Sequence, residues 1–304
     1  MHMLNHDVAR LQSGDRVLVV ANPSTRRRID PIFAELRATA PEGVELDFRM
    51  TQGGGDATVI SREHAPGAAM VIAIGGDGTV SEVAGNLDHG RIPLGIISAG
   101  STNIIARELG IPNDMRQAIA LLWGPHQLRR IDAGTCNGTI FLHMAGAGFD
   151  SRFFDLTDRR LKRKVGWIAY LPAAVKALGD DPVSYHIKTV EQEFDVVSPL
   201  VLVANGPSII NPRLKLRHDI RKDDGWLDVL IVMATRPVEL ARTLGRLATL
   251  QLGKSPYVTH LRVKELELSA QQPMPVQLDG DVLEQTPVRF GILPSEVSII
   301  CPAT

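Results

Sequence analysis

Two aspartates near the end of the chain, Asp279 and Asp281, flank a single glycine between two strand-like segments. A carboxylate in such a turn can accept the proton of an attacking hydroxyl, and a general base of this kind contributes about 10²–10⁴-fold to a rate. The pair Asp-Gly is also a common two-residue hairpin turn, which needs no catalytic explanation. The residues therefore predict either a proton acceptor or a structural turn, and both alternatives stay open at this point.

A glycine-rich turn, Gly75-Gly76-Asp77-Gly78-Thr79, follows an apolar run and opens a segment with a helical pattern. Glycines let the backbone approach a ligand closely. The first turn of the following helix presents unpaired N–H groups and a partial positive charge, which suit a phosphate. Asp77 could reach a metal ion that bridges phosphate oxygens. The alternative is an ordinary turn in which Asp77 or Thr79 caps the helix.

A second small-residue turn, Ser98-Ala99-Gly100-Ser101-Thr102-Asn103, repeats this arrangement one strand–helix unit later. Because the carboxyl ends of neighbouring parallel strands meet at one edge of a sheet, we expect the two turns to line one crevice. The sequence contains no GxxxxGK[ST] P-loop and no protein-kinase HRD and DFG set. It also lacks a GxGxxG with an acidic residue about 20 positions later, which disfavours a dinucleotide-binding Rossmann site.

The pattern of expected strands and helices, which must position these turns, changes at Asp132. Before it, strand and helix patterns alternate, which predicts a mostly parallel sheet covered on both faces. After it, strand-like runs dominate, which predicts a β-rich second domain. The expected strands are 17–21, 44–50, 70–74 and 93–97, then 139–144, 183–189, 200–204, 227–233, 263–269 and 288–293. The expected helices are 30–38, 56–64, 79–87 and 102–109, then 164–178 and 237–252.

The composition is that of an ordinary globular protein, with 304 residues, 44% apolar, 22% charged and a formal net charge of -1. This charge gives no general attraction to nucleic acid. The two cysteines, Cys136 and Cys301, lack the spacing of a disulfide scaffold or a zinc site. No apolar run approaches the roughly 20 residues that a membrane-spanning helix needs, and no signal peptide is visible. We expect a cytoplasmic protein that meets a membrane only at its surface.

Four motifs occur in order along the chain. They are Asn22-Pro23-Ser24-Thr25-Arg26, the run from Gly75 to Glu82, the run from Gly100 to Arg107, and Asp279-Gly280-Asp281. Gly-Phe-Asp at 148–150 and Gly-x-x-x-Tyr at 166–170 accompany them. Together they resemble the diacylglycerol kinase catalytic-domain family, which includes bacterial lipid kinases and sphingosine kinases and is distantly similar to NAD kinases.

The resemblance implies an α/β fold: an NAD-kinase-like nucleotide-binding domain at 1–132, completed by a returning strand at 292–304, and a β-sandwich-like domain at 133–291. In that family, ATP and lipid meet in the cleft between the two domains. The positions that would bind nucleotide are Asn22, Thr51, Gly75, Gly76, Asp77, Gly78, Thr79, Glu82, Gly100, Ser101 and Asn103.

The resemblance also implies a catalytic base in the terminal Asp-Gly-Glu motif. The third position is Asp281 here, so both Asp279 and Asp281 remain candidates, with Asp77 as a further catalytic residue. A structural Mg²⁺ is implied at Asp224 and the carbonyls of Arg221 and Trp226. The alternative is an Asp-Asp-Gly turn before a strand. Asp132 would join a carboxylate network with Asp77.

Three positions depart from the family pattern. Ile104 stands where several members have an aspartate, Arg26 to Arg28 replace the glycine of the first motif, and Ser101 replaces a threonine. The arginines fit either phosphate binding or a solvated loop. None of these changes removes the expected base, so we expect an active enzyme.

The function implied by the resemblance is ATP- and Mg²⁺-dependent phosphorylation of a lipid hydroxyl, such as that of diacylglycerol, in phospholipid biosynthesis. A basic run at 159–164, near Phe153, Phe154 and Trp167, fits either contact with anionic headgroups or a solvated helix face. Leu240, Leu244 and Leu247 have helical spacing and favour a core face. The alternatives are an NAD kinase-related kinase of a soluble metabolite, a non-catalytic nucleotide-binding regulator, and a structural protein. The lipid and the oligomeric state, a homodimer included, stay open.

Overall fold

The computed structural model describes residues 11–25, 27–148, 182–209, 211–234, 236–248 and 255–303. The chain divides into two compact units, each described here by itself. Unit 1 contains residues 1–131 and 295–304, and unit 2 contains residues 132–294. Two long strands, β5 (Gln127–Cys136) and β18 (Val288–Cys301), each run from one unit into the other.

Unit 1 is built on a parallel sheet with the strand order β2-β1-β3-β4-β18. The strands before β18 are β1 (Arg16–Ala21), β2 (Glu45–Met50), β3 (Met70–Gly75) and β4 (Leu94–Ser98). Every residue of β3 and β4 is buried, as expected for a parallel sheet covered on both faces. The order reverses between β1 and β3, and in open α/β sheets ligands bind beyond the carboxyl ends of the strands at such a point.

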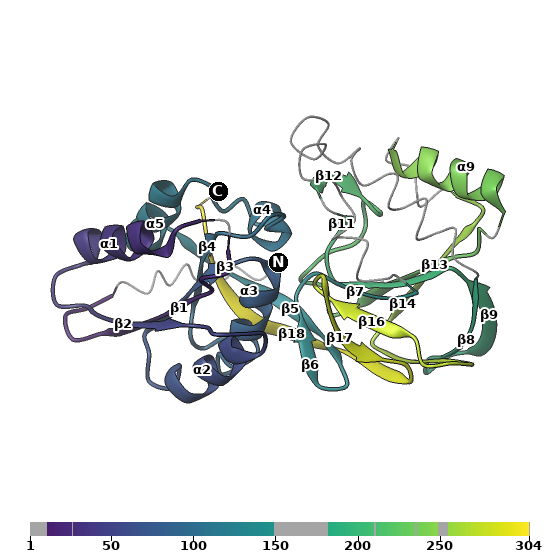
Figure 1. Ribbon diagram of the computed structural model, residues 1–304, viewed down its shortest axis with the longest axis horizontal. Helices are drawn as coiled ribbons and strands as arrows, with labels where there is room; N and C mark the ends of the chain where they lie inside the picture. The colour runs from purple at the N-terminus through teal and green to yellow at the C-terminus, as the bar shows by residue number, and fades with distance from the viewer. Residues whose placement is uncertain are drawn as a thin grey trace. The chain divides into compact units, whose positions relative to one another are not determined.

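The described part of unit 1 has five helices around this sheet: α1 (Ile29–Thr39), α2 (Asp56–His64), α3 (Asp77–Ala84), α4 (Ile104–Glu108) and α5 (Met115–Trp123). Figure 1 shows α1 and α5 together on one face of the sheet and α2 on the other. The buried side chains of α1 recur with helical spacing at Ile29, Ile32, Phe33 and Leu36, so one stripe of this helix enters the core.

In the described part of unit 2, two large antiparallel sheets share one core between their inner faces. The six-stranded sheet has the order β14-β13-β10-β7-β16-β17. The other has β18, β15, β8 and β9 in order, and β5 pairs with both β18 and β6. Val203 and Val229 from the first sheet pack in one cluster with Tyr185, Leu268 and Phe290 from the second. Two sheets packed through alternating inward residues form a β-sandwich.

The strands of the first sheet are β7 (Met144–Ala147), β10 (Leu200–Ala204), β13 (Leu227–Val232), β14 (Val258–Val263), β16 (Pro275–Leu278) and β17 (Asp281–Gln285). The second sheet contains β6 (Thr139–Phe141), β8 (Val183–Lys188), β9 (Glu193–Ser198) and β15 (Glu265–Ala270). A small ribbon is formed by β11 (Ser208–Ile209) and β12 (Asn211–Lys215), and α9 spans Pro237–Ala248.

Several expected boundaries were wrong. The helix expected at 79–87 begins earlier and ends at Ala84, and the strand expected at 139–144 is divided into β6 and β7. The strand expected at 288–293 continues to Cys301. The helix expected at 164–178 lies outside the described residues, as do positions 249–254 and the side chains of Leu240, Leu244 and Leu247. Among the helices described, none has the length and apolar character to cross a membrane.

Candidate active site

The glycine-rich turn after β3 leads directly into α3, which begins at Asp77. The residue at the N-cap is Gly76, in an extended conformation, and no side chain caps the helix. The alternative in which Asp77 or Thr79 caps this helix is therefore wrong. The first turn of α3 offers backbone N–H groups that have no intrahelical partner, and the partial positive charge of the helix end favours an anion there.

The turn after β4 touches the turn after β3, as the parallel arrangement predicted. A Cβ added to Gly100 would lie 2.5 Å from the Cα of Gly76, so only glycine allows this approach. The Ala99 N–H donates to the Gly75 carbonyl at 2.8 Å. The Asp77 Oδ1 accepts a hydrogen bond of 3.0 Å from the Ile105 N–H, at the start of α4. The Asp77 carboxylate therefore links the turn after β3 to the turn after β4 through this hydrogen bond.

The first motif joins the same site from β1. The Asn22 N–H donates to the Ile74 carbonyl at 2.9 Å, and its Nδ2 donates to Thr79 Oγ1 at 3.3 Å. Asn22 therefore lies at the point where the strand order reverses, beside the first turn of α3. Of the arginines that replace the motif's glycine, Arg27 donates to the Asn113 carbonyl at 2.7 Å, Arg28 is exposed, and Arg26 lies outside the described residues.

Glu82 and Thr51 form hydrogen bonds with other residues of unit 1. The two carboxylate oxygens of Glu82 accept from the Gly55 and Ala57 N–H groups at 3.2 and 3.1 Å, at the start of α2. Thr51 is buried, and its N–H donates to the Ala21 carbonyl at 2.9 Å. These contacts show that both residues shape the loop after β2. Nucleotide contact by either residue stays a prediction.

Asn103 supplies an unusual acceptor at the second turn. The residue is buried and has a left-handed backbone with φ of 49°. Its Nδ2 donates to the Gly100 carbonyl at 3.0 Å, whereas its Oδ1 has no hydrogen-bond partner in the structure. A buried acceptor without a partner is costly, so a donor or a cation at this point would stabilise it. Together with the Asp77 carboxylate, this oxygen fits the oxygen ligands that Mg²⁺ prefers. Ser101, next to it, is exposed.

The acidic turn in unit 2 is a hairpin that connects β16 to β17, so the structural interpretation of Asp279-Gly280 is correct. Both central residues have positive φ, 49° at Asp279 and 102° at Gly280, which is the backbone of a tight hairpin turn. The turn also does more than reverse the chain. The carboxylate of Asp279 accepts three backbone N–H bonds, from Leu142 at 2.7 Å and from His143 and Met144 at 2.9 Å each.

The two candidate bases therefore differ in their surroundings. Asp279 is half-buried and its carboxylate anchors residues 142–144, whereas Asp281 is exposed at the first position of β17. An acid that accepts three backbone bonds is fixed in position and has few lone pairs left for a substrate proton. The arrangement favours Asp281 as the proton acceptor and Asp279 as its support.

Removing the carboxylate of Asp279 should destabilise unit 2. We expect Asp279→Ala to lower the free energy of unfolding by about 2–4 kcal/mol, because several N–H groups lose a charged acceptor and a left-handed position receives a Cβ-bearing residue without a polar side chain. Asp279→Asn is the matched control, since it keeps one carbonyl acceptor and tolerates positive φ. Urea unfolding of both variants measures the difference. Equal stability of the alanine variant and the wild type would contradict the anchoring role.

The loop at 221–226 carries the expected structural metal ligands, and as arranged it does not fit a metal ion. The Asp224 Oδ2 pairs with Arg262 at 2.6 Å, and its Oδ1 accepts from the Trp226 N–H at 3.2 Å. The Asp132 Oδ2 accepts from the Gly225 N–H at 2.7 Å. Within the described parts of the chain, no group of three or more His, Cys, Asp or Glu side chains is placed to hold a metal. A cation at Asp224 would have to displace Arg262.

Burial raises the pKa of Asp224; Arg262 opposes this shift, while Asp228 and Asp132 add to it. A raised pKa means that the folded chain holds this proton more tightly than the unfolded chain. Ionisation of Asp224 therefore lowers stability as the pH rises above the ordinary carboxyl range. In chelator at neutral pH, we expect Asp224→Asn to melt about 1–3 °C higher than the wild type. The difference should vanish in acid, and thermal melts at both pH values test this. A lower melting temperature at neutral pH would show that the pair with Arg262 dominates.

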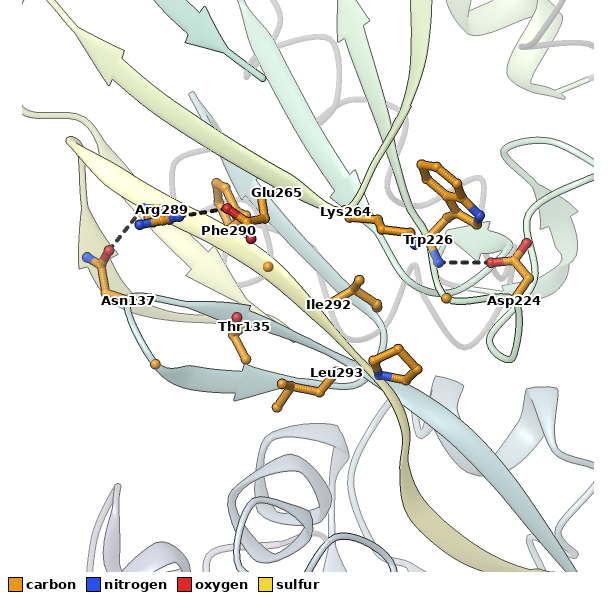
Figure 2. Close-up of a pocket in the computed structure, with 14 residues that line it drawn as sticks. Thr135, Asn137, Asp224, Trp226, Lys264, Glu265, Arg289, Phe290, Ile292 and Leu293 are labelled. Atoms are coloured by element: carbon orange, nitrogen blue, oxygen red, sulfur yellow. Dashed lines mark hydrogen bonds and ion pairs between the residues drawn. The ribbon is translucent and has the colours of Figure 1, made fainter. Parts of the chain in front are cut away.

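A pocket of about 660 Å³ lies within unit 2 beside this loop (Figure 2). Trp226 forms part of its lining, with the Lys264 Nζ 5.1 Å and the Arg262 Cζ 5.5 Å from its ring centre. Arg289 pairs with Glu265 at 2.6 Å in the same pocket. No sequence motif singled out Lys264, Glu265 or Arg289, because their proximity depends on the pairing of β15 with β18.

The remaining sequence features lie outside the described residues. They are the basic run at 159–164 with Phe153, Phe154 and Trp167, the Gly-x-x-x-Tyr motif, and all of 148–150 except Gly148. Each of them stays a prediction.

The chain matches known proteins over nearly its whole length. Residues 16–136 match the model of the diacylglycerol kinase catalytic domain, and residues 143–301 match the YegS C-terminal NAD kinase beta sandwich-like domain. A protein of Pseudomonas aeruginosa (strain UCBPP-PA14) named "Probable lipid kinase YegS-like" is 33% identical over 293 residues, with 95% of each chain covered. A diacylglycerol kinase of Staphylococcus carnosus (strain TM300) is 27% identical over 296 residues, covering 94% of this chain and 95% of that one.

The fold also matches solved structures. The structure titled "Crystal structure of a putative diacylglycerol kinase from Bacillus anthracis str. Sterne" superposes with a TM-score of 0.76 and 25% sequence identity. The match covers 96% of this chain and 98% of that chain.

Proposed function

The chain belongs to the diacylglycerol kinase catalytic-domain family, and from this premise we propose that it transfers the γ-phosphoryl group of ATP to a hydroxyl of a membrane lipid. The kinase class follows from the family. The nucleotide, the metal and the lipid are the proposal. The observation that carries it is the contact between two glycine turns at the uncapped end of α3.

In this proposal, unit 1 holds the triphosphate. The N–H groups in the first turn of α3 bind phosphate oxygens, and glycine at 76 and 100 lets the turn after β4 approach this helix end closely. Asp77 and the Asn103 Oδ1 would hold a nucleotide-bound Mg²⁺, which when bound neutralises charge on the phosphate oxygens. Phosphoryl transfer depends mainly on such positioning and charge neutralisation, so these groups account for most of the chemistry.

Unit 2 supplies the proton acceptor. Asp281 takes the proton from the lipid hydroxyl as the oxygen attacks the γ-phosphorus, and ADP leaves with the electron pair of the broken P–O bond. Asp279 holds the turn that carries Asp281. Transfer requires Asp281 to act on the lipid while unit 1 holds the nucleotide.

The acceptor that we propose is diacylglycerol, because the match to the relative named "Diacylglycerol kinase" covers 94% of this chain. The enzyme would reach it as a cytoplasmic protein at the membrane surface, and the product would serve phospholipid biosynthesis. The basic run at 159–164 would attract anionic headgroups, each charge contributing about 1 kcal/mol near such a surface. Light scattering would distinguish a monomer from a homodimer.

The deciding experiment supplies labelled ATP and Mg²⁺ with mixed micelles of diacylglycerol, phosphatidylglycerol, sphingosine or a polyprenol, and identifies products by mass spectrometry. NAD is included as a soluble acceptor. We expect a phosphorylated lipid whose formation stops in chelator. If the reaction produces labelled NADP and no labelled lipid, the protein is a kinase of a soluble metabolite. ATP binding by calorimetry without any product would establish the non-catalytic regulator, which the departures at Ile104 and in the first motif make worth testing.

A further inference from the structure

Residues 142–144 are the two residues between β6 and β7 and the first residue of β7, and hydrogen bonds hold this segment in place. Their three N–H groups all donate to the carboxylate of Asp279. The Met144 carbonyl accepts from the Asp279 N–H at 2.8 Å, and the His143 carbonyl accepts from the N–H groups of Asn205 and Gly206 at 2.9 and 2.8 Å. The Leu142 carbonyl accepts two side-chain bonds, so all six backbone groups of the segment are satisfied.

One of the two donors to the Leu142 carbonyl is a buried lysine. The Lys222 Nζ donates to this oxygen at 3.0 Å, and only 4% of the residue is exposed. Burying an ammonium group is expensive, and lysine is almost never found so deep unless it is paired or has a specific task. The backbone carbonyl of Lys222 also accepts from the Asp132 N–H at 2.6 Å, which fixes the residue at both ends.

The other donor is Asn205, which is fully buried at the end of β10. Its Nδ2 donates to the Leu142 carbonyl at 2.9 Å and to the Asp132 carbonyl at 2.8 Å, so one amide bridges β5 and the segment. Glycine at position 206 leaves room for these side chains, because a Cβ there would lie 2.8 Å from the Lys222 Nζ and closer still to the His143 ring. The absence of a side chain at position 206 therefore gives the Lys222 ammonium group the space that it occupies.

These hydrogen bonds connect Lys222 and Asn205 to the acidic turn through residues 142–144. Lys222 and Asn205 hold the Leu142 carbonyl, the N–H groups of residues 142–144 hold Asp279, and Asp279 begins the turn that carries Asp281. We propose that Lys222 and Asn205 are positioning residues, which set the place of Asp281 through the 142–144 segment without touching the substrate. This inference rests on the proposed role of Asp281 as the proton acceptor.

Lys222→Met distinguishes positioning from simple stability. The Leu142 carbonyl keeps the bond from Asn205 when the lysine is lost, so this buried acceptor still has a donor. An apolar side chain of similar length also removes the cost of burying a charge, and replacements of buried charges by apolar residues are often neutral for stability. The variant should therefore fold, with the segment held by one side-chain bond instead of two.

We expect Lys222→Met to lower kcat by about 10- to 100-fold, the size of effect that a small displacement of a reacting group produces. The KM for ATP should stay within about twofold, because the nucleotide binds unit 1. Lys188→Met is the matched control, since Lys188 is exposed on β8, and it should leave both constants unchanged. Unchanged kcat in Lys222→Met, with the fold intact, would overturn the proposal.

Two further measurements make the result specific. Hydrogen exchange should be faster at the amides of residues 142–144 in Lys222→Met than in the wild type, and unchanged exchange would also overturn the proposal. In a double-mutant cycle with Asp279→Asn, the losses in kcat should be strongly non-additive, because both residues act through one segment. Fully additive losses would mean that Lys222 acts elsewhere.

The two proposals can fail separately. A wild type that binds ATP but phosphorylates no lipid would reject the proposed function, and the exchange measurement would still decide whether Lys222 fixes the segment. An active wild type with an insensitive Lys222→Met variant would reject the positioning role alone.

Discussion

Asp281→Asn is expected to lower kcat by about 10²–10⁴-fold, the contribution of a general base, while the affinity for ATP and the melting temperature stay as in the wild type. The reason is that Asp281 is exposed at the start of β17, so its side chain contributes little to the core. The substitution keeps the size of the side chain and removes the carboxylate that would accept the proton. Steady-state kinetics on lipid micelles measure the loss.

Two controls make this prediction decisive. Asp281→Glu restores the residue type of the family motif and should keep most of the activity. Glu267→Gln removes an exposed carboxylate on β15 of the same unit and should have no effect. A rate near that of the wild type in Asp281→Asn would remove this residue from the reaction. The remaining candidate would then be Asp279, despite its bonds to residues 142–144.

Asp77→Asn should lower kcat by about 10²–10³-fold, the loss that follows removal of one group stabilising charge in the transition state. The Asp77 Oδ1 accepts from the Ile105 N–H, and asparagine can keep this bond through its amide oxygen. The variant therefore removes the negative charge but not the link between the two glycine turns. Binding of ATP should weaken in Mg²⁺ and change little in chelator, which calorimetry can measure.

Asp77→Ala separates the two tasks of this residue. It removes both the charge and the acceptor for Ile105, so it should cost stability as well as activity, by about 1 kcal/mol for a lost helix cap. Asp30→Asn, at the start of α1, is the control for the loss of one exposed acid in the same unit. If Asp77→Asn had normal turnover, the metal-binding role proposed for this carboxylate would be wrong.

The half of the candidate site that the two glycine turns form was largely predictable from the sequence. The strands that end at Gly75 and Ser98 are short apolar runs followed by glycine turns, and consecutive parallel strands place such turns side by side. The family and the α/β fold class were also correct, because four motifs in order are far more specific than any one of them. The contact between Gly76 and Gly100 confirms that these two turns meet.

The support of the acidic turn could not be predicted. Asp279 and the segment at 142–144 are more than a hundred residues apart in sequence, and nothing in Leu142-His143-Met144 signals that its N–H groups face a carboxylate. The same applies to Lys222, because a lysine in a charged loop is normally solvated. The helix α5 was missed although Asp114 caps it and its buried residues Ala118, Ile119 and Leu122 have helical spacing.

The place of β18 has a consequence for how the protein is made. Residues 295–304 belong to unit 1, where Ile299 pairs with Leu94 of β4 and the Ser298 hydroxyl donates to the Gly90 carbonyl at 2.7 Å. During synthesis, the ribosome releases β4 long before β18, so the edge of β4 must wait unpaired while all of unit 2 is translated. Such an open edge invites wrong pairing. A nascent chain halted before β18 should therefore bind chaperones and resist refolding more than the finished enzyme does.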